Sequence, residues 1–119
     1  MATGKIEKVM NDSGSGYCKM PDGTLTCWGT ISVPYPTAIT NAWGSVYESG
    51  KIDVSRNFPV AFVSNPELIV SLKSSPVSFL ENNLTASTTG ISGSYWLMRP
   101  QSTTLNNGFI SWLAIGRWK

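Results

Sequence analysis

The chain has 119 residues and a mass of 12.9 kDa, which is enough for one domain and too little for a second core. Hydrophobic residues make up 41% and charged residues only 13%, about half the usual share, which excludes disorder and predicts a hydroxyl-rich and amide-rich surface that suits sugars better than phosphates. The net charge of +2 is too small to drive binding to nucleic acid or to a membrane surface.

Short β-branched and aromatic runs between turn residues predict strands and almost no helix. The expected strand segments are 17–20, 25–31, 46–48, 52–54, 68–73, 84–88, 92–98 and 109–118, and residues 5–10 are expected to be either a first strand or the tail of an upstream stalk. A hairpin over Ser49-Gly50 is expected to join 46–48 to 52–54. Segment 32–40 is expected to be a crossing loop, 101–108 a polar loop, and 58–62 an edge or lead-in segment, because Pro59 cannot donate to a central ladder.

This spacing of strands and turns is typical of an all-β domain, an antiparallel sandwich or a small barrel. We assign residues 1–15 to a lead-in or the end of an upstream stalk, and 16–119 to the β domain. In the segment 109–115 both strand faces are largely apolar, and in 68–72 one face is. We therefore expect the last strand to be central, or covered on its second side by another subunit. Trp28 and Trp112 are expected in the core or in such an interface.

Cys18 and Cys27 flank the hairpin signal Pro21-Asp22-Gly23, which favours a type I turn with a glycine bulge. In that register Tyr17 faces Cys27, so the two sulfurs point to opposite faces and a disulfide is not expected. Free thiols are also the default in a chain assembled in a reducing cytoplasm.

The composition argues against catalysis. The chain has no His, which excludes Ser-His and Cys-His nucleophiles and most metal sites, and no cofactor motif is present. The remaining candidates are the seven carboxylates, and most of them lie in expected turns: Glu7, Asp12, Asp22, Glu48, Asp53, Glu67 and Glu81. Asp53 and Glu48 lie across one expected hairpin, but a glycosidase needs two carboxyls facing each other across a cleft. We expect no enzyme, no cofactor, no metal and no membrane insertion, since no signal peptide or membrane span is evident either.

Two stretches of the sequence resemble known domains. The hairpin 17–29, YCKMPDGTLTCWG, resembles the start of bacteriophage tail-fibre C-terminal domains, and the later segments 58–62, 66–72 and 110–118 resemble the H-type lectin domain. The resemblance implies an antiparallel β-sandwich of six to eight strands that forms a homotrimer, with sugar bound between protomers. The Trp-His pair of the lectins and the Arg of the strand before it are absent, so the resemblance does not extend to specificity for N-acetylgalactosamine.

The resemblance also implies a sugar-contacting aromatic after a Thr-Thr-Gly element. Here Thr88-Thr89-Gly90 precedes Trp96, with Tyr95 and Arg99 beside it. Trp96 and Tyr95 point to opposite faces of one strand, so only one of them can be in the core. An aromatic ring packs on the apolar face of a sugar while amides bind its hydroxyl groups. On that ground Trp43 with Tyr47, and the loop residues Asn106 and Asn107, are further candidates.

The functional hypothesis is a receptor-binding tip on the distal tail fibre of a virion, which adsorbs the phage by binding host surface polysaccharide without cleaving it. The alternative is a purely structural trimeric cap of a tail or baseplate protein. A third reading, the targeting module of a cell-wall enzyme, requires a catalytic domain in the same chain.

Overall fold

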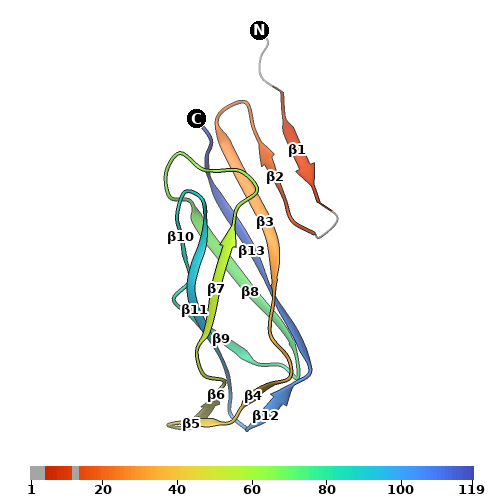
Figure 1. Ribbon diagram of the computed structural model, residues 1–119, viewed down its shortest axis with the longest axis vertical. Coiled ribbons are helices and arrows are strands. Elements are labelled where there is room, and N and C mark those ends of the chain that lie inside the picture. The colour runs from red at the N-terminus through yellow and green to blue at the C-terminus, as the bar shows by residue number, and fades with distance from the viewer. Residues whose placement is uncertain (1–4, 12–13) are drawn as a thin grey trace.

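The computed structural model describes residues 5–11 and 14–119, and within them the chain forms thirteen strands in antiparallel sheets and no helix (Figure 1). The five-stranded sheet contains, in spatial order, β1 (Glu7–Met10), β2 (Gly16–Lys19), β3 (Thr24–Ser32), β13 (Asn107–Arg117) and β8 (Glu67–Ser75). The six-stranded sheet is built around β11 (Gly90–Arg99), with β5 (Asn41–Trp43), β6 (Val46–Glu48), β7 (Ile52–Asn57), β9 (Phe79–Asn82) and β10 (Thr85–Ala86). A small third sheet pairs β4 (Thr37–Ile39) with β12 (Thr103–Leu105). The expected all-β antiparallel sandwich is confirmed, with more and shorter strands than the six to eight anticipated.

The molecule is elongated, with extents of 60 × 26 × 18 Å. The two larger sheets lie along the long axis, and β1 and the end of β13 are at one end of the molecule (Figure 1). The short strands β4, β5, β6 and β12 are at the opposite end. No described residue belongs to a helix that could cross a membrane. Residues 1–4 of the expected lead-in, and the candidate carboxylate Asp12, lie outside the described residues. Residues 7–10 of the lead-in form β1, which pairs with β2.

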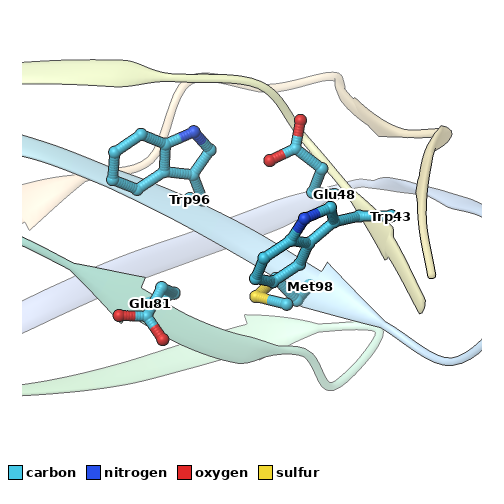
Figure 2. A pocket seen from close by; sticks show the side chains of 5 residues that line it. All are labelled: Trp43, Glu48, Glu81, Trp96 and Met98. Atoms are coloured by element: carbon cyan, nitrogen blue, oxygen red, sulfur yellow. The ribbon is translucent and has the colours of Figure 1, made fainter. Parts of the chain in front are cut away.

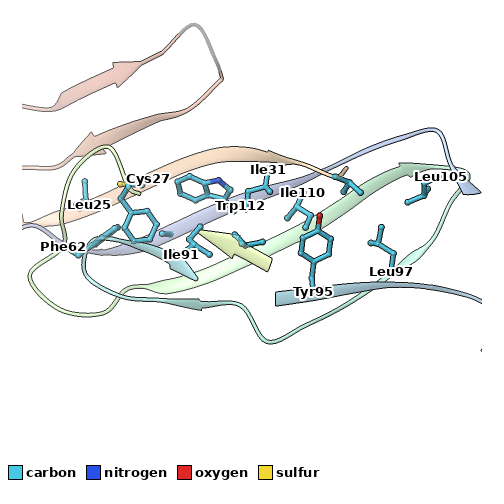
Figure 3. Packing of buried hydrophobic residues seen from close by; sticks show 14 of the residues in the cluster. Leu25, Cys27, Ile31, Phe62, Ile91, Tyr95, Leu97, Leu105, Ile110 and Trp112 are labelled. Carbon is cyan, nitrogen blue, oxygen red and sulfur yellow. The ribbon is translucent and has the colours of Figure 1, made fainter. Parts of the chain in front are cut away.

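The core lies between the two larger sheets (Figure 3). Period-two alternation along β13 turns Ile110, Trp112 and Ala114 inward, and β11 contributes Ile91, Tyr95 and Leu97 from the other side. The core therefore runs the length of the sandwich, and Trp112 is a core residue as expected.

The β2–β3 turn forms as the sequence predicts. Gly23 has a φ of 102°, the Met20 N–H donates to the Thr24 carbonyl at 2.8 Å, and the Thr24 N–H donates to Asp22 Oδ1 at 2.8 Å. Tyr17 pairs with Cys27, and both cysteines are free, as predicted. Two residues that follow β13 in sequence or end it stabilise this turn. The Arg117 guanidinium donates a hydrogen bond to the Asp22 carbonyl, and the Trp118 indole N–H donates one to the Met20 carbonyl.

The predicted hairpin between 46–48 and 52–54 is wrong. β6 pairs instead with β5 across a turn at Gly44, and β6 and β7 follow one another along the same edge of β11. The reason lies at Ser49, whose N–H donates to the Leu97 carbonyl while its hydroxyl accepts the Leu97 N–H. These bonds hold the chain against β11 where the sequence suggested a reversal. As a result, Asp53 pairs with Ser94 and Glu48 with Met98, so the expected proximity of Asp53 and Glu48 across a hairpin is also wrong.

Three segments expected outside strands make specific contacts. Within the predicted loops 32–40 and 101–108, β4 and β12 pair with each other, and Ile39 and Leu105 are fully buried there. Segment 58–62, expected to be an edge or lead-in segment, forms no strand. Instead Phe58 and Phe62 enter the core, their rings 5.1 Å apart in an edge-to-face contact, and Phe58 also packs on Trp112. The segment thus covers one end of the core, and Pro59 is exposed where no ladder bond is required.

Candidate functional site

A pocket of about 220 Å³ opens on the outer face of the six-stranded sheet, toward the end of the molecule that carries β5 and β6 (Figure 2). Its lining comes from four strands and consists of Trp43 on β5, Glu48 on β6, Glu81 on β9, and Trp96 and Met98 on β11. Pockets for drug-sized ligands occupy roughly 300–1,000 Å³. This one is smaller, and it has room for one sugar residue or a substituent of similar size.

Strand pairing explains why these five side chains share a face. Residues directly opposite each other on antiparallel strands point to the same side. Glu81 is opposite Trp96, and Glu48 is opposite Met98, two residues further along β11. Trp43 follows two residues after Asn41, the partner of Glu48 on β5. β11 therefore supplies the floor, while β9 and the β5–β6 hairpin supply the two sides.

The pocket combines apolar surfaces with negative charge. The indole of Trp43 is 61% exposed, and Trp96 and Met98 are half-buried. The carboxylates of Glu48 and Glu81 stand on opposite edges of β11, and no Lys or Arg is among the lining residues. Within residues 5–11 and 14–119, neither carboxylate forms an ion pair or a hydrogen bond. Both remain available as acceptors for a ligand. No group of three or more His, Cys, Asp or Glu side chains that could hold a metal ion occurs in the same part of the chain.

Two separately predicted aromatics meet in this pocket. Trp96 was expected from its place after Thr88-Thr89-Gly90, and Trp43 from its position in a polar segment, with nothing in the sequence to connect them. The pairing of β5 with β6 and of β6 with β11 brings them to one surface.

The site residues predicted beside Trp96 and Trp43, namely Tyr95, Arg99 and Tyr47, lie on the other face of the sheet. Tyr95 is fully buried in the core, which corrects the expectation that it contacts a sugar. No described residue forms a hydrogen bond with its hydroxyl, and burial raises its pKa. Tyr47 and Arg99 pair with each other and share the face of Tyr95, so they too turn away from the pocket. In each case the alternation of the strand separates neighbouring side chains.

Asn106 and Asn107 are exposed at the turn between β12 and β13 and do not line the pocket. The Asn106 N–H donates to the Ser75 carbonyl, and Asn107 pairs with the same residue. The turn between β12 and β13 is near the end of the molecule that carries β5 and β6 (Figure 1), and the backbones of Asn106 and Asn107 join this turn to β8.

Sequence reasoning placed none of Glu48, Glu81 and Met98 in a binding site, and the two glutamates appeared only among the seven carboxylates considered for catalysis. Met98 could have been found, because it is two residues after Trp96 on one strand and must share its face. The two glutamates could not, because their positions beside β11 depend on strand pairings that no local pattern specifies.

The outer face of the five-stranded sheet has a different character. A row of paired residues crosses all five strands: Met10, Gly16, Trp28, Leu113 and Ile69. The indole of Trp28 lies over Gly16, where an added Cβ would come within 2.8 Å of the ring. Ile69 is 57% exposed, and Phe109 and Ile115 are exposed on the same face. The row forms a continuous apolar strip across the sheet, and Trp28 belongs to it rather than to the core.

Fold and pocket together define an all-β sandwich domain with an aromatic, acidic hollow on the outer face of one sheet. Residues 19–117 match the family described as putative tail fiber protein gp53-like, C-terminal, and the chain belongs to this family. It is therefore a tail-fibre C-terminal domain and a component of a phage tail, as the resemblance predicted.

A solved structure of the N-truncated R1-type pyocin tail fibre is similar, with 20% sequence identity and a TM-score of 0.55 over 92% of this chain and 85% of that one. At this identity the likeness shows a shared fold. No curated protein matches the sequence.

Proposed function

We propose that this domain is a receptor-binding tip of the tail fibre and that it binds host surface carbohydrate in the pocket of Trp43 and Trp96, without cleaving it. The observation that carries the proposal is the pocket itself. It presents two accessible indoles and two unpaired carboxylates in a hollow the size of one sugar residue.

The chemistry of the lining suits a pyranose. An indole packs against the apolar C–H face of a sugar ring, and a carboxylate accepts hydrogen bonds from adjacent hydroxyl groups. Met98 in the same lining offers a polarizable apolar surface that adapts to the ring. Because Trp43 and Trp96 come from different strands and line the same pocket, both indoles can contact one sugar residue.

We further propose that the domain assembles as a homotrimer through the outer face of the five-stranded sheet. The continuous row through Trp28, Leu113 and Ile69 supports this, because contiguous apolar surface on a soluble protein commonly marks an interface. Assembly through this face leaves the pocket on the opposite sheet accessible. A single open pocket should bind a sugar with a dissociation constant on the order of millimolar, and three linked sites raise the overall affinity.

The test is binding of the purified domain to an array of bacterial and mammalian glycans. Trp96→Ala and Trp43→Ala should lose binding, whereas Tyr35→Ala, which removes an exposed aromatic outside the pocket, should keep it. A blank array from folded, assembled protein would favour the structural cap. Incubation with any bound polysaccharide should release no new reducing ends, and their appearance would point instead to Glu48 and Glu81 as a catalytic pair.

A further inference from the structure

The charge of the pocket restricts which glycan it can take. Glu48 and Glu81 place two carboxylates in a hollow whose other lining residues are Trp43, Trp96 and Met98. Like charges repel most strongly where water is partly excluded, so a phosphate, a uronic acid or another anionic sugar is disfavoured there.

Within the described residues, neither carboxylate of the pocket forms an ion pair. The ion pair in that part of the chain joins Lys51 to Asp53 at 3.8 Å, and Asp53 also accepts a hydrogen bond from the Ser94 hydroxyl at 2.7 Å. Arg99, on β11 itself, belongs to the opposite face of the sheet. Lys51 is therefore paired with Asp53 and Arg99 is turned away, which leaves the carboxylates of Glu48 and Glu81 without a cationic partner among the described residues.

The remaining lining residues favour positive charge as well. The face of an indole carries negative partial charge and attracts ammonium groups, and more than one such ring around a small hollow is the usual arrangement for binding alkylammonium ligands. The thioether of Met98 is polarizable and suits methylene or methyl groups next to a charged nitrogen. Figure 2 shows the two indoles on the same side of β11, with Glu48 and Glu81 at its opposite edges.

We propose that the pocket selects an ammonium-bearing group on the surface glycan. This deepens the proposed carbohydrate recognition and rests on it. The ammonium lies between the carboxylates of Glu48 and Glu81 and against the indoles of Trp43 and Trp96. The group has two possible sources, a sugar with a free amine or an alkylammonium substituent carried by the glycan.

The test uses two pairs of probes that differ in charge and little in shape. Choline is compared with 3,3-dimethylbutan-1-ol, and methyl glucosaminide with methyl N-acetylglucosaminide at about pH 6, where the free amine is protonated. Affinities are measured by calorimetry on the whole domain. In at least one pair the cationic member should bind about fivefold to tenfold more tightly than its neutral partner, and the pair with the larger ratio identifies the source.

The matched variants separate charge from shape. The double variant Glu48→Gln with Glu81→Gln keeps the side-chain volumes, and it should reduce the preference to less than about twofold. Glu7→Gln changes a carboxylate on β1 at the other end of the molecule and should leave the preference intact.

Equal binding within both pairs, tighter binding of the neutral members, or no binding of any probe would overturn the inference. So would a preference that survives in the double variant. None of these results decides the proposed function, since a glycan bound on the array and lost in Trp96→Ala would still establish carbohydrate recognition at this pocket.

Discussion

On the outer face of the five-stranded sheet, Trp28 pairs with Leu113, and Leu113 with Ile69, whereas on the outer face of the six-stranded sheet Trp96 pairs with Glu81 beside Met98. Both tryptophans are half-buried on a strand and point away from the core. Their neighbours on adjacent strands make the difference. A flat row of apolar side chains suits another protein surface, while a hollow with indoles and carboxylates suits a small polar ligand.

The difference also shows what an alternating strand pattern cannot reveal. Both Trp28 and Trp96 occur in strong strand segments, and local sequence predicts only which residues share their face. Whether that face is continued by Ile69 or by Glu81 depends on pairings with strands distant in the sequence.

The largest expected effect is a loss of stability, which should be greater for a tryptophan that faces the core than for one on an outer face. Trp112→Ala should lower the free energy of unfolding by about 3–5 kcal/mol, because it removes a buried ring that packs on Phe58. Trp96→Ala, on the outer face, should cost about 1 kcal/mol. Denaturant unfolding of both variants measures this, and equal losses would contradict the assignment of Trp96 to an accessible face.

A lysine placed on the outer face of either larger sheet tests which of the two faces takes part in assembly. Ile69→Lys should weaken self-association at least about tenfold, because an interface would have to bury an unpaired ammonium. Phe79→Lys places the same charge on an exposed apolar residue opposite Met98 and should leave the oligomer unchanged. Light scattering after size-exclusion chromatography gives the mass. Dissociation by Phe79→Lys alone would assign the interface to the pocket side.

Removing the buried hydroxyl of Tyr95 should increase the stability of the domain, in contrast to the loss expected for Trp112→Ala. Tyr95→Phe should raise the free energy of unfolding by about 1 kcal/mol, since it keeps the ring and removes a buried hydroxyl to which no described residue forms a hydrogen bond. Sugar binding should not change, because Tyr95 lies in the core beneath the pocket sheet. A loss of stability in thermal unfolding would mean that the hydroxyl is satisfied.

The two thiols report on the two sides of the five-stranded sheet. Cys27 faces the core, and burial raises its pKa to about 11, so it should stay unmodified by iodoacetamide at about pH 8 until the domain unfolds. Cys18 is half-buried on the outer side and should react faster than Cys27 in the folded protein. Mass spectrometry of peptides over time distinguishes them, and faster labelling of Cys27 would place it outside the core.

The smallest effect concerns pH. The pKa of Asp22 is lowered, mainly by the hydrogen bond from the Thr24 N–H and further by Arg117. A carboxyl with a lowered pKa in the folded state contributes stability above its unfolded pKa of about 3.9, and loses it as the pH falls through the folded value. Asp22→Asn keeps the acceptor and should make the melting temperature less dependent on pH between about pH 5 and pH 2. An unchanged slope would exclude Asp22 as a contributor.

Local chemistry predicted part of this architecture well. The β2–β3 turn followed from Pro21, Asp22 and Gly23, which fix the backbone within a few residues, and the inward position of Trp112 followed from alternation. Prediction failed at Ser49-Gly50, because two hydrogen bonds to Leu97 override a turn signal. It failed at β4 and β12 because each is only three residues long and forms only with the other.

In the candidate site, too, local sequence predicts the residues of one strand but not those contributed by other strands. Trp96 could be proposed from its surroundings in sequence, and Met98 was implied by the strand period. Glu81 is contributed by a separate strand, β9, and only the long-range pairing with β11 places it beside Trp96.

The central claim is that sugar binds at the outer face of the six-stranded sheet. The five indole N–H signals of Trp28, Trp43, Trp96, Trp112 and Trp118 in a ¹⁵N-labelled sample test it directly when a glycan that binds on the array is titrated in. Shifts confined to Trp43 and Trp96 are the predicted result. Shifts at Trp28 or Trp118 with Trp43 and Trp96 unchanged would place the binding site elsewhere and contradict the account.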